Sequence, residues 1–331
     1  FVGHLLQLLH RFAARGRGQV LQKGQARRIN VHRQCKAAGL PCHRHFLCNG
    51  GVIPRFDRGD TEAAIGRNGR GGPLHHLGVG AVAGKGGVGK TTLCGMLIQY
   101  LCEQGKGPIL AVDADANSNL NEVLGVKVDT TLGDVREEIA QAEIAKESPI
   151  PKGMTKADYA EMRFEDALVE EDDFDLLVLG RTQGKGCYCY VNGLLQTQLA
   201  KYQNHYPYIV VDNEAGMEHI SRGVLPSMQT AILVSDCSRR GIQAVGRIAK
   251  LIDECGMKPD TVGLIVNRAP KGELNDGIKE EIANQGLHLL GVVPQDETVY
   301  EYDCDGKPTA SLPEDNPVKK ALREIAGKLS L

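Results

Sequence analysis

The sequence has no run of about 18 or more apolar residues, and it does not open with the charged, apolar and small-residue succession of a secretory signal. These absences predict a cytoplasmic protein with no transmembrane helix. The chain also lacks the cysteine density of a disulfide scaffold, because 10 cysteines are spread over 331 residues. In a reducing compartment such thiols stay free unless they bind metal.

The first 78 residues contain no methionine and almost no acidic side chains. They carry 13 of the 39 Lys and Arg, 3 of the 41 Asp and Glu, and 7 of the 10 His. The remainder holds 26 basic and 38 acidic residues, so the two parts of the chain differ in composition and in the sign of their net charge. We expect residues 1–78 to be an Arg/Gly/His-rich leader, disordered or non-native translated sequence, because this composition offers little core. A basic arm for nucleic acid is the alternative. One domain is expected over 79–331.

A glycine-rich stretch, AVAGKGGVGKTT, ends an apolar segment and opens a helical pattern. It satisfies G-x-x-x-x-G-K-[ST], in which backbone N–H groups at a helix N-terminus cradle phosphate. Lys90 is expected to reach the β- and γ-phosphates, Thr91 to ligate Mg²⁺ and Thr92 to support the α-phosphate. The residues predicted to bind ATP here are Gly84, Gly86, Gly87, Val88, Gly89, Lys90, Thr91 and Thr92.

Further apolar stretches, AILVSD, VGLIVNR and LLGVVPQD, alternate with helical patterns around residues 241–255 and 274–285. Alternating strands and helices predict an α/β fold with a doubly wound, mostly parallel sheet and helices on both faces.

A second lysine, Lys85, stands at the start of the phosphate loop, giving GKGGVGKTT. With this deviant Walker A motif the sequence resembles the family of dimerising ATPases that includes MinD, ParA, nitrogenase reductase and the CooC-type nickel accessory ATPases. The resemblance implies a P-loop fold and an ATP-dependent homodimer, in which Lys85 crosses to the partner's nucleotide. Apart from this resemblance, Lys85 could be one more solvated loop lysine.

Two apolar strands end in aspartate. ILAVDAD carries Asp113 and Asp115, and YIVVDNEAG carries Asp212, with Gly216 four residues on. In open α/β sheets, ligands bind at the carboxyl ends of strands. The resemblance implies that these are the two switch segments. We expect Asp115 to orient or activate the attacking water, with Asp113 as the alternative, and Asp212 to support Mg²⁺, while Gly216 allows close approach to the γ-phosphate. A strand-end aspartate can equally be a cap.

The resemblance also implies a site for the adenine base. Asn267, in VNR, would contact the base edge, and the loop from 294 to 297 would close over it. Pro294 and Asp296 are therefore candidate base contacts.

The stretch GCYCYVN places Cys187 and Cys189 one residue apart, after the apolar run FDLLVLG. One such pair cannot surround a metal, but two copies across a two-fold axis supply four thiolates for zinc, nickel or an iron–sulfur cluster. Half-buried core residues are the alternative. With DNEAGMEHISR, the pair looks like the CooC type, which assists nickel insertion into carbon monoxide dehydrogenase, and like its relative serving acetyl-CoA synthase. Nitrogenase reductase has a further cysteine after the second switch aspartate, which NEAGMEHISRG lacks.

The resemblance therefore implies a homodimeric ATPase that uses ATP, Mg²⁺ and Ni²⁺ or Zn²⁺ and serves carbon monoxide dehydrogenase or acetyl-CoA synthase. A positioning ATPase on membrane or DNA, and a cluster-bearing reductase, are the alternatives. The C-terminal stretch has an apolar stripe at Val318, Leu322, Ile325 and Leu329. We expect it to pack on the sheet rather than bind a membrane, and we expect no nucleic-acid partner.

Overall fold

The fold is known from a computed structural model, which describes residues 78–144, 150–181, 188–203, 205–216 and 228–329. The expected leader lies outside this part of the chain except for its last residue, and so does Cys187. Within the described residues, no helix is both long and apolar enough to cross a membrane.

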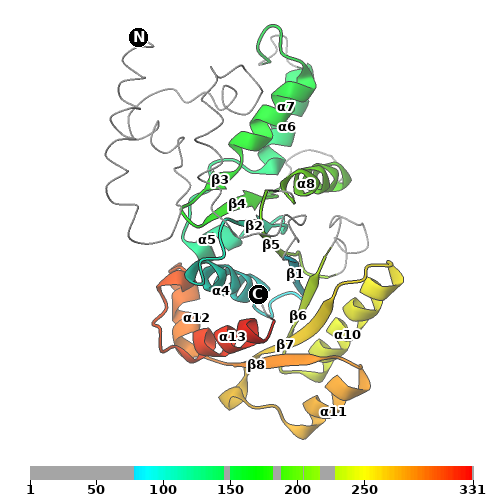
Figure 1. The fold of residues 1–331 in the computed structure, drawn as a ribbon, viewed down its shortest axis with the longest axis vertical. Helices are drawn as coiled ribbons and strands as arrows, with labels where there is room; N and C mark the ends of the chain where they lie inside the picture. Colours follow the sequence, from blue (N-terminus) through cyan, green and yellow to red (C-terminus); the bar gives the residue numbers. More distant parts are fainter. Residues whose placement is uncertain (1–77, 145–149, 182–187, 204, 217–227, 330–331) are drawn as a thin grey trace, which may run out of the picture. The chain divides into compact units, whose positions relative to one another are not determined.

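An eight-stranded sheet forms the centre, in the order β3-β4-β2-β5-β1-β6-β7-β8. Every neighbouring pair is parallel except β3 and β4. The predicted doubly wound, mostly parallel α/β sheet is therefore confirmed (Figure 1). The strands are β1 (Gly78–Gly84), β2 (Ile109–Asp113), β3 (Val169–Glu170), β4 (Phe174–Val178), β5 (Tyr208–Asp212), β6 (Thr230–Asp236), β7 (Thr261–Ala269) and β8 (Leu289–Pro294).

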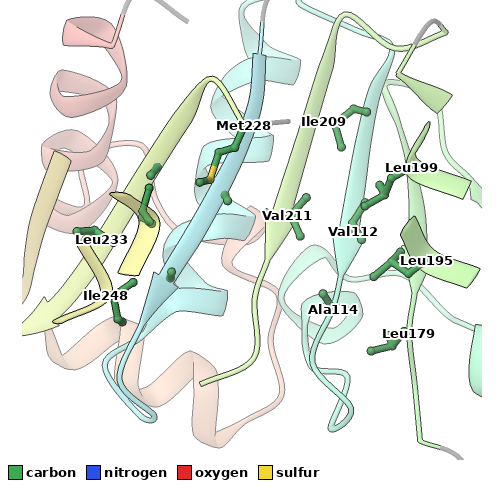
Figure 2. Close-up of a cluster of buried hydrophobic side chains, with 14 of the residues drawn as sticks. Val112, Ala114, Leu179, Leu195, Leu199, Ile209, Val211, Met228, Leu233 and Ile248 are labelled. Atoms are coloured by element: carbon green, nitrogen blue, oxygen red, sulfur yellow. The ribbon is translucent and has the colours of Figure 1, made fainter. Parts of the chain in front are cut away.

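Helices cover both faces of the sheet, which explains why β2 and β5 are apolar up to the aspartate that ends each of them. Successive strand residues point to opposite faces, so Val112 joins the core under α8 whereas Ala111 joins the core under α4. Figure 2 shows Leu195 and Leu199 of α8 beside Val112. On the first face lie α6 (Leu132–Ile144), α7 (Lys156–Asp166), α8 (Tyr188–Tyr202), α10 (Arg239–Glu254) and α11 (Asp276–Asn284); on the second lie α4 (Lys90–Glu103), α5 (Leu120–Leu124), α12 (Glu297–Cys304) and α13 (Pro317–Lys328).

The strand order reverses at β1. Strands β5, β2 and β4 extend to one side of it, and β6, β7 and β8 extend to the other. Ligands of doubly wound sheets bind at the carboxyl ends of strands at this kind of switch point. Asp113 and Asp212 are register partners there, on β2 and β5. Ala111 and Val210 lie two residues before these aspartates and are buried under α4. Because every second strand residue points to the same face, both carboxylates also face α4, the helix that starts at the phosphate loop.

The C-terminal helix α13 packs on the sheet, as predicted. Val318, Leu322 and Ile325 are buried and belong to the same core as Leu93 and Leu97 of α4. The apolar stripe of α13 is therefore buried in the core of this domain.

We predict that Leu322→Ala lowers the free energy of unfolding by about 2–4 kcal/mol, because Leu322 is 3% exposed and its removal leaves a cavity. Glu324→Ala, at an exposed position of the same helix, should change it by less than about 0.5 kcal/mol. Urea unfolding of both variants checks this. Equal stability of wild type and Leu322→Ala would show that α13 is not packed as described.

Candidate functional site

The phosphate loop leads from β1 into α4, and no side chain in the described ranges caps this helix. Gly89 is the N-cap at φ +89°, and Gly87 lies at φ +76°. Both angles fall in the left-handed region, which glycine adopts without strain. The first N–H groups of α4 have no intrahelical partners, and with the helix dipole they form an anion site. Thr91 and Thr92 lie in the first turn, as the motif predicts.

Lys90 is buried within this loop at 7% exposure, and its Nζ donates a hydrogen bond to the carbonyl oxygen of Lys85 at 3.3 Å. Burial lowers the pKa of Lys90, while the carboxylates of Asp212, Asp115 and Glu214 oppose that shift. The ammonium is thus held where a phosphate bound by the loop would meet it. Lys85 itself is exposed, so its side chain is accessible from outside the subunit.

Asp212, at the end of β5, is 1% exposed and faces the start of α4. The Thr91 hydroxyl donates a hydrogen bond to its carboxylate, but Oδ1 is buried without a partner among the described residues. Burial raises the pKa of Asp212 to about 7. Mg²⁺ takes oxygen ligands, commonly one or two from protein together with phosphate and water. A hydroxyl beside an unpartnered, desolvated carboxylate oxygen therefore fits a Mg²⁺ site.

The two aspartates after β2 have different surroundings. The Asp113 carboxylate is fully buried and accepts hydrogen bonds from the backbone N–H of Asp115 at 3.0 Å and of Leu120 at 2.9 Å. Burial raises the pKa of Asp113 to about 6, and these bonds oppose the shift. Asp115 is half-buried, and its Oδ1 accepts from the N–H of Asn117 at 2.8 Å. Asp113 therefore closes the 113–120 loop, which leaves Asp115 as the more accessible carboxylate.

Residues 213–216 are fastened to β1. The Asn213 side-chain amide donates to the carbonyl oxygen of Val82 at 3.1 Å, while Asn213 Oδ1 is buried without a partner in the described part of the chain. The N–H of Gly216 donates to the carbonyl oxygen of Gly84 at 3.2 Å. A contact from that N–H to a phosphate would require this hydrogen bond to open.

Asn267, the expected base contact, touches the phosphate loop. It is 5% exposed, and its Nδ2 donates to the carbonyl oxygen of Val88 at 2.8 Å. This bond uses one of the two N–H groups of the amide, so the other N–H and the oxygen are what the side chain could offer a base. The expected 294–297 loop is shorter than predicted, because Pro294 ends β8 and Glu297 begins α12. The Asp296 carboxylate caps α12 by accepting a hydrogen bond from the N–H of Val299 at 3.0 Å. Helix capping therefore explains this residue without a contact to the base.

Two residues of the site escaped the sequence analysis. Arg181 follows β4 and donates a hydrogen bond to Asn117 Oδ1, in the loop of Asp115. Arg268 donates to the carbonyl oxygen of Gly87 at 3.0 Å. Both contacts join segments far apart in the chain, so no local pattern indicates them.

The cysteine pair is only partly within the described structure. Cys187 lies outside it, and Cys189 falls in the first turn of α8, which starts at Tyr188. Among the described residues, no group of three or more His, Cys, Asp or Glu could hold a metal ion. The predicted thiolate site thus remains a prediction.

Comparisons with known proteins agree with this geometry. Residues 79–309 match the family model of the CobQ/CobB/MinD/ParA nucleotide binding domain. An uncharacterized ATP-binding protein of Methanocaldococcus jannaschii is 41% identical over 249 residues, which are 75% of this chain and 97% of the relative. The carbon monoxide dehydrogenase accessory protein CooC of Rhodospirillum rubrum is 29% identical over 235 residues, 64% of this chain and 87% of the relative.

Among solved structures, MinD of Pyrococcus horikoshii complexed with Mg-ADP superimposes with a TM-score of 0.56 at 25% identity. The alignment covers 76% of this chain and 94% of that one. The two proteins are thus similar in fold as well as in sequence.

We predict that Asp212→Asn stabilises the nucleotide-free protein at pH 8 but not at pH 4. The folded protein holds the Asp212 proton up to about pH 7, whereas an unfolded chain releases it near pH 3.9. Stability from this group is therefore present at low pH and is lost as the pH rises through about 7. At pH 8 the substitution removes a buried charge, which is worth about 2–4 kcal/mol.

Thermal unfolding at both pH values checks this, with Asp260→Asn as the exposed control. The same gain at pH 4 and pH 8 would rule out the buried charge as its cause.

Proposed function

The chain belongs to the CobQ/CobB/MinD/ParA family of nucleotide-binding domains, and from this premise we propose that it is a Mg²⁺-dependent ATPase that converts ATP and water to ADP and phosphate. The observation that carries the proposal is the Thr91–Asp212 pair beside the Lys90 ammonium, with a buried carboxylate oxygen that finds no partner within the described part of the chain. It supplies the oxygen ligands and the positive charge that phosphoryl transfer requires.

The chain's own residues then take separate roles. The free N–H groups at the start of α4 and Lys90 bind the phosphates, while Thr91 and Asp212 would hold Mg²⁺, which neutralises the charge that develops on the phosphate oxygens. Asp115 orients the attacking water, because its carboxylate is the more accessible of the two after β2. Asp113 keeps that loop in shape. Exposed Lys85 reaches the nucleotide of a second copy of the chain.

We further propose that the ATP-bound homodimer brings two Cys187–Cys189 pairs together around one Ni²⁺ or Zn²⁺ ion as cargo. Two thiolates from each copy complete a four-coordinate site that neither copy holds alone. Similarity to the carbon monoxide dehydrogenase accessory protein CooC of Rhodospirillum rubrum supports an accessory role. We propose that this role is nickel insertion into carbon monoxide dehydrogenase or acetyl-CoA synthase. ATP can drive this assembly only if it binds the two states of the dimer with different affinity.

A positioning ATPase is the second candidate, supported by the likeness to MinD of Pyrococcus horikoshii. Burial of the apolar stripe of α13 disfavours its membrane-bound form, because the face that would enter a bilayer is occupied by α4 and the sheet. ATP-dependent co-sedimentation with lipid vesicles or DNA would favour this candidate over the metal carrier. Visible absorbance from an oxygen-sensitive cluster would instead favour a reductase.

For the ATPase, we predict that Lys85→Ala lowers turnover at least about 100-fold while ATP binding to the single subunit changes by less than about threefold. The reason is that Lys85 is exposed and acts across the dimer, so its loss removes transition-state charge compensation but not the loop. Steady-state phosphate release measures turnover, titration calorimetry measures ATP binding, and sedimentation velocity with ATP shows whether the dimer forms. Lys152→Ala, another exposed lysine, serves as control. Full turnover by Lys85→Ala would refute the dimeric mechanism.

For the cargo site, we predict that Cys187→Ser combined with Cys189→Ser abolishes metal binding and leaves ATP affinity unchanged. Wild type with ATP should bind one ion per dimer, measured by elemental analysis of the sized complex. The control is Cys255→Ser with Cys304→Ser, which removes two exposed thiols elsewhere. Equal metal content in both double variants would refute the thiolate site.

A further inference from the structure

Arg268 has a backbone conformation that glycine would adopt at lower cost. Its φ is +55°, in the left-handed region, and it sits where the register of β7 shifts against β8 between Val266 and Ala269. A side chain in this region is strained, and such residues persist where the surrounding structure has a use for them. The use must lie in the arginine side chain, because the backbone alone would be better served by glycine.

The irregular backbone brings two consecutive side chains to the same loop. In a regular strand, Asn267 and Arg268 would point to opposite faces of the sheet. Here the Arg268 guanidinium donates to the carbonyl oxygen of Gly87 at 3.0 Å, and Asn267 Nδ2 donates to the carbonyl oxygen of Val88 at 2.8 Å. The end of β7 thus holds two successive carbonyl groups of the phosphate loop.

Holding the carbonyl groups also orients the N–H groups. In a planar trans peptide, the C=O and the following N–H point in opposite directions. When the carbonyls of Gly87 and Val88 are drawn toward β7, the N–H groups of Val88 and Gly89 point away from it. This is the orientation in which the loop's N–H groups can converge on an anion before one arrives.

We propose that Arg268 is a positioning residue of the phosphate loop, which together with Asn267 fixes the Gly87 and Val88 carbonyls so that the following N–H groups are preorganised for the nucleotide's phosphates. The inference rests on the proposed nucleotide binding and adds a role that base recognition does not require. A guanidinium suits it because a charged donor makes a stronger bond to a carbonyl than a neutral one.

The two hydrogen bonds from Arg268 and Asn267 to the Gly87 and Val88 carbonyls act as a clamp on the phosphate loop. Three variants distinguish this clamp from an effect on folding. Arg268→Ala removes the guanidinium and keeps the strained conformation, Arg268→Gly removes both, and Arg268→Lys retains a charged donor. We expect Arg268→Ala and Arg268→Gly to bind ATP roughly fivefold to tenfold more weakly than wild type, although Arg268→Gly unfolds at a temperature no lower than Arg268→Ala. Arg268→Lys should recover part of the affinity. Arg247→Ala, an exposed arginine on α10, is the matched control.

Inorganic tripolyphosphate distinguishes the loop from the base site. Because the clamp acts through the phosphates, tripolyphosphate should lose affinity by the same factor as ATP in titration calorimetry of the full-length variants. A loss for ATP alone would overturn the proposal and assign Arg268 to the base. Wild-type affinity for ATP in Arg268→Ala and Arg268→Gly would overturn it as well. If wild type bound no ATP at all, the proposed function would fail and the clamp with it.

Discussion

The rest of the site depends on a carboxylate held out of water at the end of β5, directly against the first turn of α4. The Asp212 side chain meets the Thr91 hydroxyl there, one of its oxygens has no partner among the described residues, and burial raises its pKa to about 7. Nothing in a stable core requires such a group, because an apolar side chain would be cheaper to bury. The cation and phosphates of the proposed function would account for its position, because they would give that oxygen a partner and the N–H groups of α4 an anion.

The sheet makes this arrangement possible by separating apolar and polar positions along each strand. Helices on both faces require apolar side chains along the full length of the central strands, so polar groups can occur only where strands end. Parallel order then collects these ends at one edge. Asp113 and Asp212 are register partners on neighbouring strands and face the same helix, so the Asp113 carboxylate adds to the effect of burial in raising the pKa of Asp212.

The sequence predicted the parts of this arrangement that follow from local pattern. A glycine-rich loop between strand and helix, and apolar runs that end in aspartate, indicate both the fold and Asp212. It could not show which of Asp113 and Asp115 is free to act on water. Only the folded loop shows that the Asp113 carboxylate accepts two backbone hydrogen bonds. Arg181 bonds a residue 64 positions away, and Arg268 bonds one 181 positions away. Such contacts are set by strand order, which spacing does not reveal.

The buried charges of the site oppose the stability of the fold. Burial disfavours the charged forms of Lys90, Asp113 and Asp212, so the nucleotide-free protein holds its binding groups at some cost in stability. The Gly216 N–H is meanwhile bonded to Gly84, at the base of the same loop. A ligand that partners the buried groups and competes for that N–H has different free energies of interaction with the fastened and released forms of residues 213–216. Such a difference is what allows nucleotide binding to change conformation, and contacts equal in both forms could not do so.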